Sequence, residues 1–442
     1  MDHPSGSASV TTRAPSEDER SCVGPLPMAF FASALINFAV GSTLGLWMAS
    51  KTSSWAVLAS LHAEINPWGW LTMAIFGMTY AVLSISAELR LHPRVAGWVH
   101  LAIAELGIVL LVAGLAANRL ILTRLGAVVQ TASPVLFLTN ILLAVRAKRQ
   151  GRVQPPVIPE HLRYLGRRED CRRSDRVARR GTDLSGLLLV ASAIWACWGI
   201  WSDGESSPGA TVLLDDGWLI GTVVSVSLHF YPRLISGERM PAWPFSLFQA
   251  IWFPATVALS LGTAYHINML AGVGRDALGT CLVWVAVVFE IALVRRSRGA
   301  CGHGIGAVAS SPATRLAWSL GYGFAGIAGG WMVVGRESDA LPVLHALFLG
   351  WMTTLVYGTS YAVMPVLFDI RIRSAKISIA QLSISAIGVV LMMGGFADLD
   401  APVGRALLAA GGGLAWLAFA WYFVRIGWGG IHILRRASTR AV

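Results

Sequence analysis

The sequence is poor in charge. Only 13% of its 442 residues are Asp, Glu, Lys or Arg, whereas 55% are hydrophobic. Charged residues make up about a quarter of a typical soluble chain, so a water-soluble globular protein is excluded. The mean hydropathy of +0.60 instead indicates an integral membrane protein.

Several motifs that would assign a chemistry are missing. The five cysteines form no C-x-x-C pair and no C-x-x-C-H sequence, which argues against a disulfide framework and against covalently attached haem. No Walker A loop is present, which argues against an ATP-driven pump. Residues 1–27 lack an apolar core, so they do not form a cleavable signal peptide. We expect them to be a disordered cytoplasmic tail.

Apolar stretches of about 20 residues, the length that spans a bilayer as a helix, occur twelve times. They are 28–49, 57–84, 97–117, 123–145, 184–201, 212–234, 243–266, 277–294, 314–335, 341–368, 375–396 and 403–425. These stretches predict an all-α integral membrane protein with twelve transmembrane helices.

The basic residues predict the orientation. They gather in loops after even-numbered helices, as at Arg90 and Arg94, and cytoplasmic loops are enriched in Lys and Arg. Both termini are therefore predicted to be cytoplasmic, in a bacterial-type inner (plasma) membrane. The net charge of +11, concentrated between Arg146 and Arg180, indicates anionic membrane lipids as partners. No nucleic-acid partner is expected, because no nucleic-acid-reading module accompanies the charge.

The sequence of the second stretch recurs 281 residues later. The identical pairs are Gly69/Gly350, Trp70/Trp351, Thr72/Thr353, Gly77/Gly358, Tyr80/Tyr361, Ala81/Ala362 and Val82/Val363. A weaker copy lies on the sixth stretch, where Asp216 is five residues before Gly221. The same spacing separates His345 from Gly350. The chain therefore resembles three copies of a four-helix unit, with helices 2, 6 and 10 in equivalent places about a central axis.

These features divide the chain into seven parts. They are a disordered cytoplasmic tail (1–27), a first four-helix unit (28–145), a basic cytoplasmic linker (146–183), a second four-helix unit (184–295), a cytoplasmic loop (296–313), a third four-helix unit (314–427) and a basic C-terminal tail (428–442).

Two histidines, His62 and His345, lie near the outer ends of helices 2 and 10. Ionisable groups inside membrane spans are costly and mark functional sites, although a lone histidine at a helix end also satisfies backbone carbonyls. Their offset within the repeat is what a bis-imidazole clamp on one ligand requires. Gly69 and Gly350 then either leave room for a planar macrocycle or only allow close helix packing. Candidate cationic partners for haem propionates are Arg275, Arg405, Arg336, Arg119 and Arg124.

Carboxylates accompany these histidines. One hypothesis is a mixed metal site of His62, His345, Glu64 and Asp216, whose oxygen and imidazole ligands suit copper(II), zinc or iron better than copper(I). Glu64 alternatively carries protons or pairs with Arg275.

The sequence from residue 345 to 351, His-Ala-Leu-Phe-Leu-Gly-Trp, resembles helix 10 of the haem-copper oxidase subunit I superfamily, especially the cbb-type oxidases. The residues that continue the pattern are Gly358, Tyr361 and Pro365. His62 resembles the low-spin haem ligand of helix 2. The run Tyr231-Pro232-Arg233-Leu234, with Gly237 and Arg239, resembles a cytoplasmic corner of that fold. NnrS proteins, membrane haem and copper proteins linked to nitric oxide stress, are similar in size and number of spans.

The chain departs from those oxidases at their binuclear centre. The position of the histidine that binds the high-spin haem is Val343. Helix 7 lacks the copper-binding histidine pair and has only His266 at its far end. Helix 6 carries Asp215 and Asp216 in place of a copper ligand. The resemblance, which covers residues 28–425, therefore implies a degenerate centre and leaves a low-spin, bis-histidine haem b at His62 and His345.

We expect an oxidase-like b-type haem protein that acts in electron transfer or in nitric oxide or oxygen-related redox chemistry, with copper as a further candidate cofactor. Whether it is an enzyme stays open. The chain has no redox domain outside the bundle, so a separate electron donor or other redox subunits are expected as partners. The alternative is a cofactor-free or metal-binding transporter, or an accessory subunit of a membrane redox complex, because one fold hosts unrelated functions.

Overall fold

The computed structural model describes residues 24–166, 168–236, 239–298, 311–335, 340–368, 370 and 374–440. Residues 1–23 of the predicted tail, most of the loop predicted at 296–313, and Gly237 and Arg336 lie outside them. The described chain forms twelve long helical rods. Nine rods are continuous: α2 (Pro25–Ser50), α5 (Val95–Ala116), α6 (Leu120–Arg149), α7 (Arg172–Ser202), α10 (Trp243–Ala264), α11 (Asn268–Arg298), α12 (Pro312–Val334), α15 (Ala375–Ala397) and α16 (Pro402–Arg440).

Three rods are interrupted by a segment of π-helix. They are α3 (Trp55–Glu64), η2 (Ile65–Thr72) and α4 (Met73–Ser86); α8 (Pro208–Val212), η5 (Leu213–Ile220) and α9 (Gly221–Tyr231); and α13 (Ala340–His345), η8 (Ala346–Thr353) and α14 (Thr354–Phe368). Short helical turns complete the described elements: η1 (Thr52–Ser54), η3 (Glu160–Leu165), η4 (Glu169–Cys171) and η6 (Pro232–Ser236).

The rods confirm a multi-pass, all-helical membrane protein. Eleven of the described helices are long and apolar enough to cross a membrane, and α12 is the twelfth rod. Each of the twelve predicted stretches falls on one rod. The rods extend beyond the predicted stretches where the chain turns polar: α7 begins at Arg172, inside the predicted linker, and α16 continues to Arg440, through most of the predicted tail. Hydropathy detects only the apolar part of such a helix, because Arg and Lys are also good helix formers.

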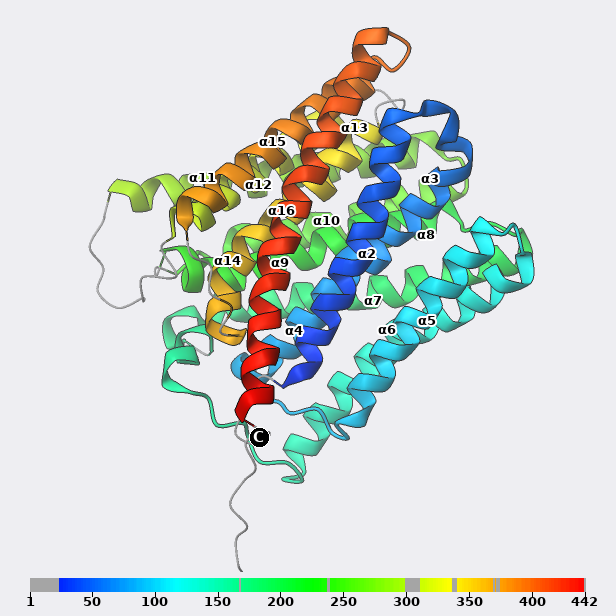
Figure 1. Ribbon diagram of the computed structural model, residues 1–442. Coiled ribbons are helices and arrows are strands. Elements are labelled where there is room, and N and C mark those ends of the chain that lie inside the picture. The colour runs from blue at the N-terminus through cyan, green and yellow to red at the C-terminus, as the bar shows by residue number, and fades with distance from the viewer. Residues whose placement is uncertain are drawn as a thin grey trace, which may run out of the picture.

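The interrupted rods form the centre of the bundle. In the most apolar part of these three rods, 61%, 72% and 61% of the residues are buried, against 33–44% in the other eight candidate spans. The continuous rods surround them and expose apolar side chains outward, as membrane helices do. The first and last rods, α2 and α16, lie side by side (Figure 1).

Each of the three π-helical segments that interrupt these rods is eight residues long and contains a Gly-Trp pair. The pairs are Gly69-Trp70, Gly217-Trp218 and Gly350-Trp351. A π-helical turn holds an extra residue and turns the following side chains to a new direction. The segments place Gly217 in the position of Gly69 and Gly350, whereas the sequence comparison used Gly221. Asp216 consequently does not correspond to His345.

The tryptophans of these pairs link the central rods. The Trp70 indole N–H donates to Thr353 Oγ1 at 3.1 Å, and the Trp218 indole N–H donates to Thr72 Oγ1 at 3.0 Å. All four side chains are almost completely buried. Each threonine acceptor lies two residues after the tryptophan of its own segment. The equivalent residue of η5 is Ile220, whose side chain has no hydrogen-bond acceptor. The central rods are thus joined by buried hydrogen bonds.

Candidate functional site

His62 on α3 faces the glycines of α2. Its Nδ1 lies 2.9 Å from the carbonyl oxygen of Gly41. A carbonyl oxygen only accepts hydrogen bonds, so Nδ1 carries the proton and donates it. A Cβ at Gly45 would lie 2.7 Å from His62 Cε1. The glycines of α2 therefore leave the space that the imidazole occupies, and Asn66 fixes the turn below by donating to the His62 carbonyl at 2.8 Å.

His345 ends α13 and is held in the same tautomer. Its Nδ1 donates to the carbonyl oxygen of Leu341 at 2.8 Å. In both histidines Nδ1 is thus protonated, and Nε2 carries an unshared electron pair. Metal-binding histidines adopt this arrangement, in which the outer ring nitrogen donates to a carbonyl or carboxylate and orients the ligand nitrogen.

The two imidazole rings are nearly parallel. Their centroids lie 6.4 Å apart and their planes differ by 14°. Two metal–nitrogen bonds of about 2.0 Å, with about 1 Å from each nitrogen to its ring centre, add up to about 6 Å. The centroid distance matches this sum, which is one condition for a metal ion held by both His62 and His345.

The surroundings of this pair are apolar. Phe396 of α15 packs against His345, with ring centroids 4.5 Å apart. A small buried cluster of Ala49, Met392 and Leu408 adjoins Phe396 and joins α2, α15 and α16. Two imidazoles whose Nε2 atoms have no hydrogen-bond partner among the described residues are a donor set that fits haem iron.

Gly69 and Gly350, which were candidates for leaving room for a macrocycle, contact neighbouring helices. A Cβ at Gly69 would lie 2.8 Å from Asn37 Cβ on α2, and one at Gly350 would lie 2.6 Å from Phe324 Cγ on α12. Side chains of adjacent rods thus occupy both spaces. This favours close helix packing over the alternative that these glycines make room for a macrocycle.

The predicted arginines that the structure describes are spread over several helices. Arg405 donates to the carbonyl oxygen of Asp400 at 2.8 Å and so fastens the loop before α16. Arg124 donates to the carbonyl oxygen of Trp201 at 2.8 Å and lies over that indole. Arg275 lies on α11, which packs mainly against α10 and α12, whereas the histidine pair lies on α3 and α13.

The predicted mixed metal site is not assembled. In the part of the chain that the structure describes, no three His, Cys, Asp or Glu side chains come together as metal ligands. Glu64 and Asp216 therefore do not join His62 and His345. The register of η5 explains this, because Asp216 does not occupy the position that corresponds to His345. Asp215 is instead the carboxylate within electrostatic range of Glu64.

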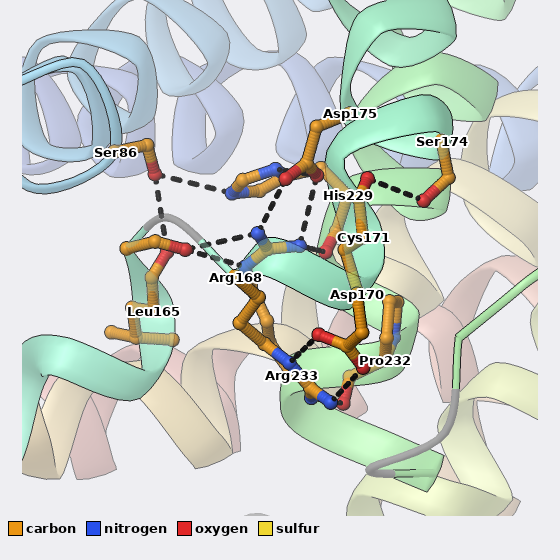
Figure 2. Close-up of polar contacts among 11 residues, drawn as sticks. Ser86, Leu165, Arg168, Asp170, Cys171, Ser174, Asp175, His229, Pro232 and Arg233 are labelled. Carbon is orange, nitrogen blue, oxygen red and sulfur yellow. Dashed lines mark hydrogen bonds and ion pairs between the residues drawn. The ribbon is translucent and has the colours of Figure 1, made fainter.

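A polar network that the sequence did not reveal lies where α7 meets the end of α9 (Figure 2). Its centre is Arg233, whose side chain is fully buried. The guanidinium donates to both carboxylate oxygens of Asp175, at 3.0 and 2.8 Å. His229 Nδ1 lies 2.9 Å from the same carboxylate, and its Nε2 lies 3.2 Å from Ser86 Oγ.

The remaining donors of Arg233 bind backbone. Arg233 Nε and Nη2 donate to the Gly166 carbonyl at 3.1 and 2.9 Å. Arg233 Nη1 donates to the His229 carbonyl at 2.7 Å. The network therefore fastens the segment after η3 and the first turn of α7 to the central rod of α9. Sequence alone placed Arg233 in a corner motif and Asp175 in a linker. The sequence did not single out Asp175, because it is one of four acidic residues between Arg146 and Arg180.

His100 is a second residue that the sequence analysis missed. It is completely buried on α5, with Nδ1 2.8 Å from Tyr80 Oη and Nε2 3.2 Å from Ser133 Oγ. Both ring nitrogens thus have side-chain partners, unlike those of His62 and His345. The Tyr361 hydroxyl makes a similar contact and donates to Gln381 Oε1 at 2.8 Å. Gln381 follows Tyr361 by 20 residues, as His100 follows Tyr80.

Comparison with known proteins identifies the fold. No protein-family model matches the sequence, and comparison with curated proteins finds no match. Among solved structures, the chain is similar to a haem-copper terminal oxidase determined as a dimer by cryo-electron microscopy. The TM-score is 0.52 at 13% identity, over 94% of this chain and 84% of that one. The chain thus has the fold of a haem-copper terminal oxidase, as the sequence resemblance implied.

Proposed function

We propose that this chain is an oxidase-like membrane haem protein that carries electrons through one b-type haem held by His62 and His345. The observation that carries the proposal is the pair of near-parallel imidazole rings, 6.4 Å apart, each with its Nδ1 bound to a backbone carbonyl. The fold of a haem-copper terminal oxidase supports it.

The chain's own residues prepare this site. The Gly41 and Leu341 carbonyls hold both imidazoles in the tautomer that presents Nε2, and Phe396 packs beside His345. A haem with two histidine ligands supplies one-electron exchange and has no open position for a substrate. The site therefore favours electron transfer over oxygen or nitric oxide chemistry.

We further propose that the chain lacks a second, oxygen-reducing centre. Val343 stands where the resemblance requires a haem-binding histidine. On the α10 side, Trp252 packs against Gly221 and donates to the Asp216 carbonyl at 2.8 Å. Phe324 packs against Gly350. Aromatic side chains thus fill the space at Gly221 and at Gly350. Copper belongs to this proposal only as a candidate still to be measured.

Three repeated four-helix units, 28–145, 184–295 and 314–427, are part of the same proposal. The three π-helical Gly-Trp segments support them, as do the matching contacts of Tyr80 and Tyr361. We propose cytoplasmic termini in a bacterial-type inner membrane, from the arginine distribution. We also propose a separate electron donor or redox subunits as partners, because the similar structure is an oxidase assembled as a dimer.

The reduced-minus-oxidised visible spectrum of the detergent-purified protein tests the cofactor, with pyridine haemochrome to identify the haem. We expect a sharp b-type band that is lost in His62→Ala and in His345→Ala. His100→Gln is the matched control, because it removes a buried histidine that already has two partners and introduces the residue found beside Tyr361.

Haem-free protein that is folded and monodisperse would overturn the proposal and favour a cofactor-free transporter or accessory subunit. A b-type band that persists in both alanine variants would overturn the ligand assignment. Metal analysis of the same preparations decides whether copper accompanies the iron.

A further inference from the structure

The first turns of α7 carry a cluster of exposed arginines. They precede the apolar part of the helix, which begins at Leu184, and are Arg172, Arg173, Arg176, Arg179 and Arg180. Asp175 lies among them in the sequence, but its carboxylate binds the buried guanidinium of Arg233. Asp175 therefore does not compensate the charge of these outer arginines.

The outer arginines belong to a stripe of exposed residues that runs along α7. The members of the stripe are Arg173, Arg176, Arg180, Asp183, Leu187, Ala191, Ile194 and Trp198. They follow one another at intervals of three or four residues, the spacing that keeps side chains on one face of an α-helix. In the apolar part, Leu187 is 60% exposed and Trp198 is 72% exposed. The stripe thus changes from cationic to apolar along the helix.

α6 carries a second stripe with the same change of character. The members of this stripe are Val128, Val135, Thr139, Leu142, Arg146 and Arg149, all of them exposed. Leu142 is 67% exposed, and Arg146 follows it by about one helical turn. On both helices an arginine-rich end therefore continues directly into an apolar surface of the kind that contacts acyl chains.

Contacts along the seam between α6 and α7 fix how the two helices are aligned. Thr131 Oγ1 lies 3.0 Å from the carbonyl oxygen of Ala193. Seven residues further along α6, a methyl group of Leu138 lies 3.3 Å from the position of a Cβ at Gly186, which is seven residues earlier on α7. The helices are therefore antiparallel, and each step along α6 matches one step back along α7.

The same alignment brings the cationic ends of the two stripes to one level. It places the arginine end of α6 opposite residues 175–178 of α7, at the level of Arg176. At the other end of the seam, the Arg124 guanidinium of α6 lies 5.2 Å from the ring centroid of the exposed Trp201 of α7. The exposed surface of α7 consequently borders α6, and arginines of both helices lie at one end of the seam.

These arginines differ in what already binds them. Those with side-chain partners are Arg172, Arg179 and Arg180, whose partners are Glu169, Asp183 and Gln249. The side chains that form no hydrogen bond or ion pair with any described residue are Arg146, Arg149, Arg173 and Arg176. Four cationic groups at one level without acceptors repel one another and attract an anion.

A ligand that uses both parts of this surface joins an anionic group to a long apolar chain. Guanidinium groups bind phosphate through paired hydrogen bonds. A nucleic acid or an acidic protein would use the arginines, but it would leave the apolar parts of both stripes unused. An anionic phospholipid uses the arginines and the apolar residues together.

We propose that one anionic phospholipid binds at the seam of α6 and α7. Its phosphate lies among Arg146, Arg149, Arg173 and Arg176, and its acyl chains lie along the apolar parts of the two stripes. The site is separate from the histidine pair and does not depend on haem. It differs from the general attraction of basic loops to an anionic bilayer, because it is local and holds one lipid.

Thermal unfolding of the full-length protein in detergent tests the site, as phosphatidylglycerol replaces phosphatidylcholine at constant total lipid, pH and ionic strength. A ligand that binds only the folded state raises the unfolding temperature saturably. We expect saturation with phosphatidylglycerol. The half-saturating mole fraction should rise at least about tenfold in Arg146→Gln/Arg149→Gln and in Arg173→Gln/Arg176→Gln, the loss expected for two arginines beside one lipid phosphate.

The matched control is Arg315→Gln/Lys376→Gln. It removes two exposed positive charges at the same end of the bundle, but from α12 and α15 of the third group of helices. This variant has the same net charge as either arginine variant, and its half-saturating mole fraction should equal that of the wild type. Native mass spectrometry of the wild type should retain one phosphatidylglycerol per chain.

Phosphatidylcholine acting as strongly as phosphatidylglycerol would overturn the proposal, as would glycerol phosphate acting as strongly as the whole lipid, because the site would then bind a free anion. An equal rise in the control and in the arginine variants would reduce the effect to net charge and also overturn it. Unchanged half-saturation in both arginine variants would do the same. If one arginine variant fails to fold, the other gives the decision, and if both fail, the comparison of the three ligands on the wild type does.

Discussion

Removing the charge of Asp175 is expected to destabilise the protein strongly. The Asp175→Asn substitution keeps the size of the side chain and removes the counter-ion of the fully buried Arg233. It also removes the carboxylate that lies 2.9 Å from His229 Nδ1. The guanidinium then keeps its bonds to the Gly166 and His229 carbonyls and carries an uncompensated charge.

The magnitude follows from burial. Breaking a buried ion pair by removing one partner costs about 3–5 kcal/mol. The Asp175 side chain is 24% exposed, so water can approach, and the amide oxygen of asparagine still accepts one hydrogen bond. Screening of this kind lowers the expected loss to about 2–3 kcal/mol of unfolding free energy.

Thermal unfolding in detergent, followed by tryptophan fluorescence, measures this loss. Asp183→Asn on the same helix is the control, because Asp183 is 72% exposed and 4.0 Å from Arg179; it should change stability by less than about 0.5 kcal/mol. In a double-mutant cycle, Arg233→Met should cost less in the Asp175→Asn background than in the wild type. Equal stability of the two asparagine variants, or strict additivity in the cycle, would refute the assignment of Asp175 as the counter-ion.

Three further outcomes are expected from the same assay. Thr353→Val removes the acceptor of the buried Trp70 indole, 3.1 Å away, and should cost about 1–3 kcal/mol; no change would mean that the bond does not form in solution. Gly350→Ala places a Cβ 2.6 Å from the ring of Phe324 and should cost about 1–3 kcal/mol of unfolding free energy. In the control, Gly323→Ala, the new Cβ has no atom within 4 Å, so the substitution should be neutral or stabilising. Equal effects of the two substitutions would contradict the packing of Gly350 against Phe324. His100→Leu removes the imidazole that contacts the buried hydroxyl groups of Tyr80 and Ser133 and should cost about 1–3 kcal/mol without changing haem content, so haem loss there would contradict the assignment of the ligands.

The membrane fold was predictable from composition because a bilayer demands long apolar helices. The pair of His62 and His345 was predictable in the same way, since histidines are rare inside spans. Sequence could not reveal that both Nδ1 atoms are held by backbone carbonyls, because Gly41 and Leu341 contribute no side-chain signal. The sequence also could not locate the π-helical segments. The sequence comparison therefore aligned Gly221 of the sixth helix with Gly69 and Gly350, whereas the structure places Gly217 at that position.

The networks around Arg233 and His100 were missed for a related reason. Hydropathy treats a polar residue at a helix end as a boundary, so Asp175 was assigned to a linker, although α7 begins at Arg172. His100 lies in an apolar stretch without any repeated motif at its position. Its role depends on Tyr80 of the preceding rod, and such a pairing between helices is fixed only by packing.

The low-temperature electron paramagnetic resonance spectrum of the oxidised protein tests the central claim most directly. Two imidazoles with near-parallel planes, here 14° apart, would give a rhombic low-spin ferric signal if both bound one haem iron. We predict one such signal per chain, lost in His62→Ala and in His345→Ala and retained in His100→Gln. Folded protein without a low-spin ferric signal, or a signal that survives both alanine substitutions, would contradict the assignment of these two histidines as the ligands of one haem.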